Sequence, residues 1–324
     1  MKTRLTVLDN MQGLAMLLVV IGHSAFNGIS PAWCFKVKDL LYSFHMALFV
    51  FISGFLIRYN YREITSLIQY REFILKRLKK FGIPFLTVGT ICLVLTAWER
   101  HFGASEFAEG FFYLILAPRQ SHSGFLWYIY LLFEFYCLVP LLYKLKGWWQ
   151  LALLVCLAYP ALHPLPFQWG ACDHASRFLF FLYAGSLAAN IFLSEHGKFS
   201  FYLLVPIAVA ALGFVALEVY FWINGIELYS FFAGVLSIPF IFGLSLLLMK
   251  CSCCTEVLGV ISRNCFYIYL LHLFVLQFIS KCFLLAEPYI RLPFEVYILI
   301  AIPAALTVPV LFQRWRKKWQ TISD

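Results

Sequence analysis

Apolar segments of about 20 residues recur along the whole chain and constrain its fold more than any other feature. A helix rises 1.5 Å per residue, so a segment of this length crosses roughly 30 Å of hydrocarbon. Hydrophobic residues make up 62% of the chain and charged residues 13%, against roughly 45–50% and 25% in soluble domains. The sequence therefore predicts an all-α polytopic membrane protein, with a single domain over residues 1–324. The expected bundle has about ten transmembrane helices, at residues 10–27, 40–58, 81–98, 125–143, 148–163, 175–193, 201–222, 228–249, 264–286 and 294–313.

The distribution of Lys and Arg tests this topology. With an even number of spans, both termini lie on the same side of the membrane. If that side is the cytoplasm, 18 of the 25 Lys and Arg residues fall in inner segments and five in outer segments. Cytoplasmic loops of membrane proteins are enriched in these residues. We therefore expect both termini to be cytoplasmic, in a multi-pass protein of the bacterial inner (plasma) membrane.

Two segments depart from the simple pattern. Residues 107–117 are apolar but too short to span, so we expect an interfacial or re-entrant piece in the longest outer loop. The first apolar run follows Lys2 and Arg4, as in a signal peptide, but polar residues beginning at Asp9 interrupt it. We therefore expect this run to be a retained first helix.

Most of the ten cysteines sit singly in predicted helices, where a cysteine acts as a small hydrophobic residue. The exception is Cys251, Cys253 and Cys254, which share a predicted inner loop. A reducing cytoplasm leaves such residues as thiols, and a metal site would need further ligands that the sequence does not place there. Lipidation or no role is expected for them, and no metal is predicted for the protein.

Two histidines lie at matching depth in consecutive spans. His23 is about four residues from the outer end of the first predicted span, and His45 is about five residues from the outer end of the second. Gln12 lies about 20° from His23 around the first helix, and Asp9 lies within about 40° of the same stripe. Ionisable groups inside a bilayer cost about 2.5–3.5 kcal/mol each and usually mark a site or a pathway. One face of the first helix is therefore expected to carry functional polar groups.

Four other ionisable residues fall inside predicted spans. Arg177 and Glu218 lie in the outer parts of their spans, and Glu134 and His272 lie near the middle of theirs. A polar cavity in the outer half of the bundle would explain them together. The alternative is that His272 and Glu134 each only satisfy an interhelical hydrogen bond.

His23 and His45 together suit general-base chemistry, because an imidazole can accept a proton from a hydroxyl at physiological pH. Metal binding is less favoured, since no third ligand is placed at a suitable spacing in these helices. Ser24 follows His23 directly, so the two side chains point about 100° apart and cannot form a nucleophile–base pair within the helix.

The loop between the second and third predicted spans holds the second group of candidate functional residues. It carries seven of the 25 basic residues, and its run Lys76-Arg77-Leu78-Lys79-Lys80 leads into Gly82-Ile83-Pro84. One interpretation is an anchor for anionic lipid. The other is a docking site for a phosphorylated cytosolic ligand.

Four stretches carry a joint resemblance. They are Arg4 to Gly13 continuing to Val20-Ile21-Gly22-His23, then Tyr42-Ser43-Phe44-His45-Met46 with Phe49 to Leu56, then Lys76 to Lys80 with Ile83-Pro84-Phe85, and finally Leu126-Trp127-Tyr128 with Tyr267 to His272. Together they resemble the acyltransferase-3 family of integral-membrane O-acyltransferases, especially its branch of fucose 4-O-acetylase-like proteins. Their order and spacing fit across most of the chain.

The resemblance implies His23 as the catalytic base, with His45 and Asp9 as supporting polar residues. It also implies that Arg77 and Lys80 belong to a basic motif close to the acyl-CoA.

The chain departs from the family pattern at two positions. Family members commonly carry a basic residue at the position of Gln12. They usually carry Arg at the position of Lys80, where this chain loses the planar guanidinium fork. We still place Gln12, together with Lys76, among the expected cofactor-binding residues.

Family members move an acyl group, usually acetyl from acetyl-CoA, to a hydroxyl on a sugar, a lipid-linked glycan or another acceptor. The expected partners are therefore acyl-CoA, a hydroxyl-bearing glycan or lipid-linked acceptor, and membrane lipid, with no nucleic acid. The main alternative is a proton-coupled secondary transporter or flippase. A membrane sensor or scaffold without chemistry is a third possibility.

Trp127, Arg177 and Glu134 are the expected substrate-binding residues. Outer aromatic residues such as Trp33, Trp127 and Trp169 could stack on sugar rings. The alternative interpretation is the ordinary aromatic belt of a membrane interface.

Overall fold

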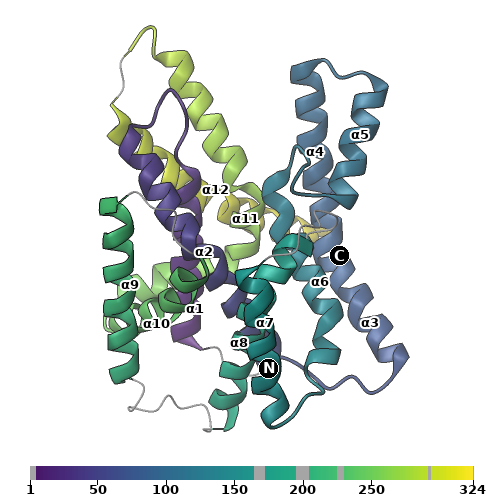
Figure 1. Cartoon of the computed structure of the whole chain (residues 1–324). Coiled ribbons are helices and arrows are strands. Elements are labelled where there is room, and N and C mark those ends of the chain that lie inside the picture. Colours follow the sequence, from purple (N-terminus) through teal and green to yellow (C-terminus); the bar gives the residue numbers. More distant parts are fainter. Residues whose placement is uncertain (1–4, 164–171, 195–203, 225–229, 291–292, 324) are drawn as a thin grey trace. The chain divides into compact units, whose positions relative to one another are not determined.

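The structure, a computed structural model, describes residues 5–163, 172–194, 204–224, 230–290 and 293–323 (Figure 1). Every regular element in these ranges is helical. The elements are α1 (Thr6–His23), α2 (Ala32–Tyr59), α3 (Leu67–Arg77), the π-helix η1 (Leu78–Gly82), α4 (Ile83–Arg100), α5 (Ala104–Leu116), the 3-10 helix η2 (Gly124–Leu126), α6 (Trp127–Leu142), α7 (Trp148–Leu162), α8 (Cys172–Ser194), α9 (Leu204–Asn224), α10 (Ser230–Leu248), α11 (Ser252–Ala286) and α12 (Phe294–Ser323).

Nine helical segments within the described ranges are long and apolar enough to cross a membrane. One of them, Leu67–Arg100, is formed jointly by α3, η1 and α4. The remaining predicted span, 148–163, is the fifth along the chain and corresponds to α7, which is apolar but has only 15 residues. The predicted all-α, multi-pass architecture is confirmed, with α7 as the one span shorter than expected.

The apolar segment 107–117 lies largely within α5, which has 13 residues. This helix is too short to cross about 30 Å of hydrocarbon. It follows α4 after a turn in which His101 adopts a left-handed conformation, with φ 56°. The two helices pack together, because Gly110 of α5 leaves room for Leu93 of α4.

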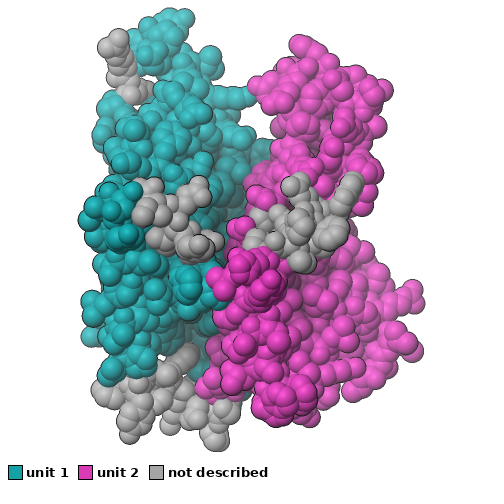
Figure 2. All heavy atoms as spheres, in the orientation of Figure 1, with its two compact units in different colours: residues 1–53, 192–324 teal, residues 54–191 magenta. Residues whose placement is uncertain are grey.

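The described chain separates into two compact units (Figure 2). The first unit is residues 1–53 with 192–324, and it holds α1, most of α2, and α9 to α12. The second unit is residues 54–191, and it holds α3 to α7 and most of α8. The single domain over residues 1–324 stays a prediction.

Glycines bring helices into close contact in each unit. In the first unit, a Cβ on Gly13 of α1 would lie 2.5 Å from the carbonyl oxygen of Leu258 of α11, so the two backbones approach more closely than any larger residue allows. In the second unit, a Cβ on Gly54 would collide with the backbone of Leu182 of α8. Small residues allow such approach between membrane helices, where packing drives association.

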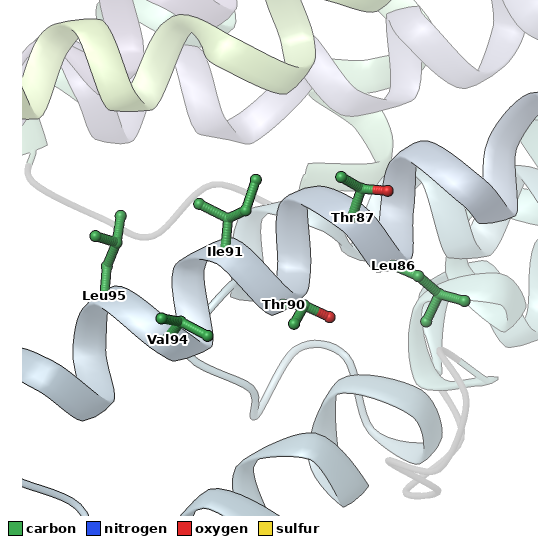
Figure 3. Close-up of a pocket in the computed structure, with 6 residues that line it drawn as sticks. All are labelled: Leu86, Thr87, Thr90, Ile91, Val94 and Leu95. Atoms are coloured by element: carbon green, nitrogen blue, oxygen red, sulfur yellow. The ribbon is translucent and has the colours of Figure 1, made fainter.

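Large apolar side chains cover much of the surface, as lipid-facing helices require. One exposed face of α4 is hollowed into an open groove lined by six residues, Leu86, Thr87, Thr90, Ile91, Val94 and Leu95 (Figure 3). The Thr87 hydroxyl donates to the carbonyl of Ile83 in its own helix. The lining has no titratable side chain, so this groove suits lipid chains rather than catalysis.

Candidate active site

Three helices of the first unit bring histidine and tyrosine side chains together around His23. His23 is the last residue of α1 and is half-buried. Its ring lies 5.2 Å from that of His272 of α11, in an edge-on arrangement. The His23 ring also lies 5.5 Å from the ring of Tyr42 of α2. The helical phase that places His23 on the stripe of Gln12 is thus the phase that faces α11.

His45 joins this cluster through Tyr42. The rings of Tyr42 and His45 are 5.0 Å apart, three residues apart on α2. His45 is 4% exposed, and it lies within electrostatic range of His23. The structure therefore brings together the two histidines that the sequence places at similar depth, with a tyrosine between them.

The backbone fixes the tautomer of all three histidines. Nδ1 of His23 lies 2.8 Å from the carbonyl oxygen of Val19, and Nδ1 of His45 bonds in the same way to the carbonyl of Leu41. Nδ1 of His272 lies 2.9 Å from the carbonyl oxygen of Ile268. A carbonyl oxygen only accepts hydrogen bonds, so each neutral ring carries its proton on Nδ1. The lone pair is then on Nε2, so this atom of each ring is the one that can accept a proton.

A second polar group lies at the other end of α1. Ser262 of α11 donates to Oε1 of Gln12 at 2.8 Å, and its oxygen also lies 3.2 Å from Oδ1 of Asp9. Cys265 is hydrogen-bonded to Gln12 as well. At 1.5 Å per residue, Gln12 is about 16 Å and Asp9 about 21 Å along the helix from His23. Asp9 and Gln12 therefore share the α1–α11 seam with His23 but do not join the histidine cluster.

The basic motif lies in the second unit, where α3 passes through η1 into α4. The guanidinium of Arg77 lies 4.5 Å from the Tyr136 ring of α6 and 5.0 Å from the Phe73 ring. Lys76 and Lys80 are exposed, and Nζ of Lys80 lies 5.1 Å from the Phe81 ring. The π-helix begins directly after Arg77, and such one-turn irregularities are frequent at functional sites.

The three expected substrate-binding residues all lie in the second unit. Trp127 of α6 stacks on Phe178 of α8 with centroids 5.8 Å apart. Arg177 precedes Phe178 and is exposed, and Glu134 is half-buried on α6, two turns after Trp127. None of the three belongs to the histidine cluster. Trp169 lies outside the described residues.

Sequence reasoning missed the contribution of Tyr42 and left the role of His272 open. The spacing of Tyr42 and His45, three residues apart on one helix, was an available signal. The contact between His23 and His272 depends on the packing of α1 against α11, which no local pattern encodes. Glu218 of α9 is 7% exposed and accepts a hydrogen bond from the Ser43 hydroxyl at 3.2 Å, so its role in the structure is a link between α2 and α9.

No cluster of three or more His, Cys, Asp and Glu residues is placed to hold a metal ion in the ranges that the structure describes. Comparison with known proteins gives one positive result. A family model described as an acyltransferase domain, that of acyltransferase family 3, matches residues 5–314. Searches of curated proteins and of solved structures find no match. The matched range includes both units and every side chain described above.

Proposed function

The chain belongs to the acyltransferase-3 family, and from this premise we propose that it moves an acyl group, most simply acetyl, from cytosolic acyl-CoA to a hydroxyl of a sugar, a glycan or a lipid-linked acceptor. Family membership implies a membrane O-acyltransferase. The donor, the acceptor and the residues that perform the transfer are our proposal. The fucose 4-O-acetylase-like branch stays a prediction.

The observation that carries this proposal is the arrangement of His23. The Val19 carbonyl holds the proton on Nδ1 and leaves Nε2 as the base. The side chain stands at the end of α1, half-buried and next to two further polar rings. A base held by its own helix in one tautomer is preorganised for proton transfer.

The transfer then takes two steps. Nε2 of His23 accepts the proton of the acceptor hydroxyl while the hydroxyl oxygen attacks the thioester carbonyl. The tetrahedral intermediate collapses with cleavage of the carbon–sulfur bond, and the CoA thiolate takes the proton from the His23 imidazolium. His272 and Tyr42 act as positioning residues, because their rings lie against His23 and restrict its orientation. His45 acts through Tyr42, whose ring it contacts. Asp9 supports this helix from the α11 seam.

We assign the donor to the basic motif. Arg77 and Lys80, with Lys76 beside them, attract the phosphate groups of the acyl-CoA. The stacking of Arg77 on Tyr136 and Phe73 supports this assignment, since it holds the guanidinium in one orientation. Gln12 would line the path of the acyl arm along α1. Trp127, Arg177 and Glu134 would contact the acceptor, with the indole as an aromatic face for a sugar ring and the two charged groups as partners for its hydroxyls.

The test is acyl transfer by the full chain in lipid nanodiscs, with acetyl-CoA labelled in the acetyl group. The proposal expects release of free CoA and movement of label into a hydroxyl-bearing acceptor, added as an extract of glycans and lipid-linked sugars. Binding of acetyl-CoA without any turnover would contradict acyl transfer. Movement of protons or solute across proteoliposomes, with no use of acetyl-CoA, would favour a transporter.

A further inference from the structure

Arg58 lies at the C-terminal end of α2, within the second unit, in a cage of aromatic and polar side chains. Its guanidinium is 4.9 Å from the centre of the Tyr143 ring and 5.9 Å from that of Tyr61. These two rings are nearly perpendicular, with centroids 4.9 Å apart. Nε of Arg58 donates to Oδ1 of Asn190 of α8. The cage therefore holds the guanidinium plane in a fixed orientation.

The charge of Arg58 has no counter-ion in the described part of the chain. The side chain is half-buried, and its contacts with the described residues are the amide of Asn190 and the two tyrosine rings. These contacts use Nε and the ring faces and leave the terminal NH₂ groups for a ligand. A partly buried charge without an opposite charge is costly, and the guanidinium fork matches the oxygens of a phosphate in a bidentate way.

A buried hydroxyl on α8, the helix that carries Asn190, is also unused. Tyr183 of α8 is 1% exposed, and its hydroxyl makes no hydrogen bond with the described residues. It lies within electrostatic range of Arg58. The neighbouring hydroxyl of Tyr143 is already hydrogen-bonded to Ser186 at 2.9 Å. Tyr183 is seven residues before Asn190 and shares its face of α8, so the Tyr183 hydroxyl is available as a second donor to a phosphate oxygen.

The cage is aligned with the basic motif along α6. Arg77 contacts the ring of Tyr136, and Arg58 contacts the ring of Tyr143. The two tyrosines are seven residues apart, which places them on one helix face and about 10 Å apart along the axis. Nε of Arg77 is likewise buried without a hydrogen-bond partner among the described residues. Two arginines, each stacked on a tyrosine of the same face, thus lie along the C-terminal half of α6, toward the end that the charge asymmetry predicts to be cytoplasmic.

We propose that Arg58, with the hydroxyl of Tyr183, is a second phosphate-binding site, and that together with Arg77 it holds two separate phosphate groups of one multiply phosphorylated ligand. This inference rests on the proposed function, which makes acyl-CoA that ligand. Acyl-CoA carries a diphosphate and a ribose phosphate at different places, and two arginines about two helical turns apart suit such a ligand. A lipid headgroup offers the same phosphate ester chemistry and is the competing source.

The experiment measures equilibrium binding of CoA and of pantetheine, which lacks phosphate, to the full chain in phosphatidylcholine nanodiscs. Arg58→Gln should weaken CoA binding about ten-fold or more, the scale of a lost charged hydrogen bond, and leave pantetheine binding unchanged. Arg62→Gln is the matched control, because Arg62 is exposed and the substitution removes the same charge four residues away. This control variant should change CoA binding less than two-fold. Arg58→Lys keeps the charge but not the fork, so it should give an intermediate loss and also serves if the Gln variant does not fold.

The outcomes separate this inference from the proposed function. If the unmodified chain does not bind CoA, the proposed donor fails and the inference with it. If CoA binds and Arg77→Gln weakens it, while Arg58→Gln and Arg58→Lys behave as Arg62→Gln does, the inference alone is overturned. If the Arg58 variants keep CoA binding but lose stabilisation by phosphatidylglycerol added to the nanodiscs, the site belongs to lipid and the inference is also overturned.

Discussion

The imidazole of His272 stands edge-on to that of His23, with the two ring planes 86° apart and the centroids 5.2 Å apart. His272 is 1% exposed, and its Nδ1 lies 2.8 Å from the carbonyl oxygen of Tyr269 as well as near that of Ile268. Two backbone acceptors thus hold this ring in place. A fixed ring on α11 in turn restricts the ring of His23 at the end of α1.

His272→Phe tests this positioning role, because phenylalanine keeps an aromatic ring but removes both nitrogens. We expect a fall in kcat of about 10- to 100-fold, the scale of a misplaced reacting group, with the Kd for acetyl-CoA unchanged. The measurement is steady-state turnover beside equilibrium binding. His163→Phe, at an exposed position, is the control. A parallel loss of CoA binding would indicate a merely structural role for His272.

Gly13→Ala should destabilise the chain, because its Cβ would lie 2.5 Å from the carbonyl oxygen of Leu258 and backbone cannot move aside easily. Overpacking of this kind costs about 1–3 kcal/mol. Gly213→Ala in α9 is the matched control, since its Cβ would meet Leu236 of α10 at an ordinary 3.9 Å. Thermal unfolding in detergent should show a lower Tm for the first variant and an equal or higher Tm for the second. Equal Tm values for both variants would contradict the close approach of α1 and α11.

Cys251 should be the thiol that reacts fastest among the three cysteines at the start of α11. Hydrogen bonds from Cys254 to its sulfur lower the pKa of Cys251 below its usual value. A lowered pKa means that more of this exposed thiol is thiolate at neutral pH, and the thiolate is the form that reacts. Mass spectrometry after brief iodoacetamide treatment at pH 7 should find Cys251 alkylated before Cys253.

Cys254→Ala provides the control for this order. It removes the side-chain donor, so the alkylation rate of Cys251 at pH 7 should fall toward that of Cys253. An unchanged rate would show that the side-chain hydrogen bond from Cys254 does not set the reactivity.

The sequence predicts the spans of this protein well because hydropathy over about 20 residues reports directly on membrane crossing. It predicts helix ends less well. The helix α11 begins at Ser252, while the apolar stretch begins near residue 264, because a helix satisfies its own backbone and can continue past the hydrocarbon.

The candidate site was predictable only in part, because the sequence does not show which helices pack against each other. The sequence predicts that His23 and His45 lie at a similar depth. Helical phase predicts that Gln12 and His23 share one face of the first helix. These predictions do not say which helix that face meets. The partner, α11, is fixed by the approach of Gly13 to Leu258 and by Ser262 bonding to Gln12, which are contacts between opposite ends of the chain.

The role of His23 as general base is the central claim, and His23→Gln tests it most directly. Glutamine is similar in size and keeps hydrogen bonding, but it cannot accept a proton at neutral pH. The measurement is the rate of acetyl transfer by the purified full chain in nanodiscs, with the Kd for acetyl-CoA measured on the same sample. We predict a fall in rate of about 10²- to 10⁴-fold with the Kd unchanged. A rate within about three-fold of the unmodified chain would contradict the claim.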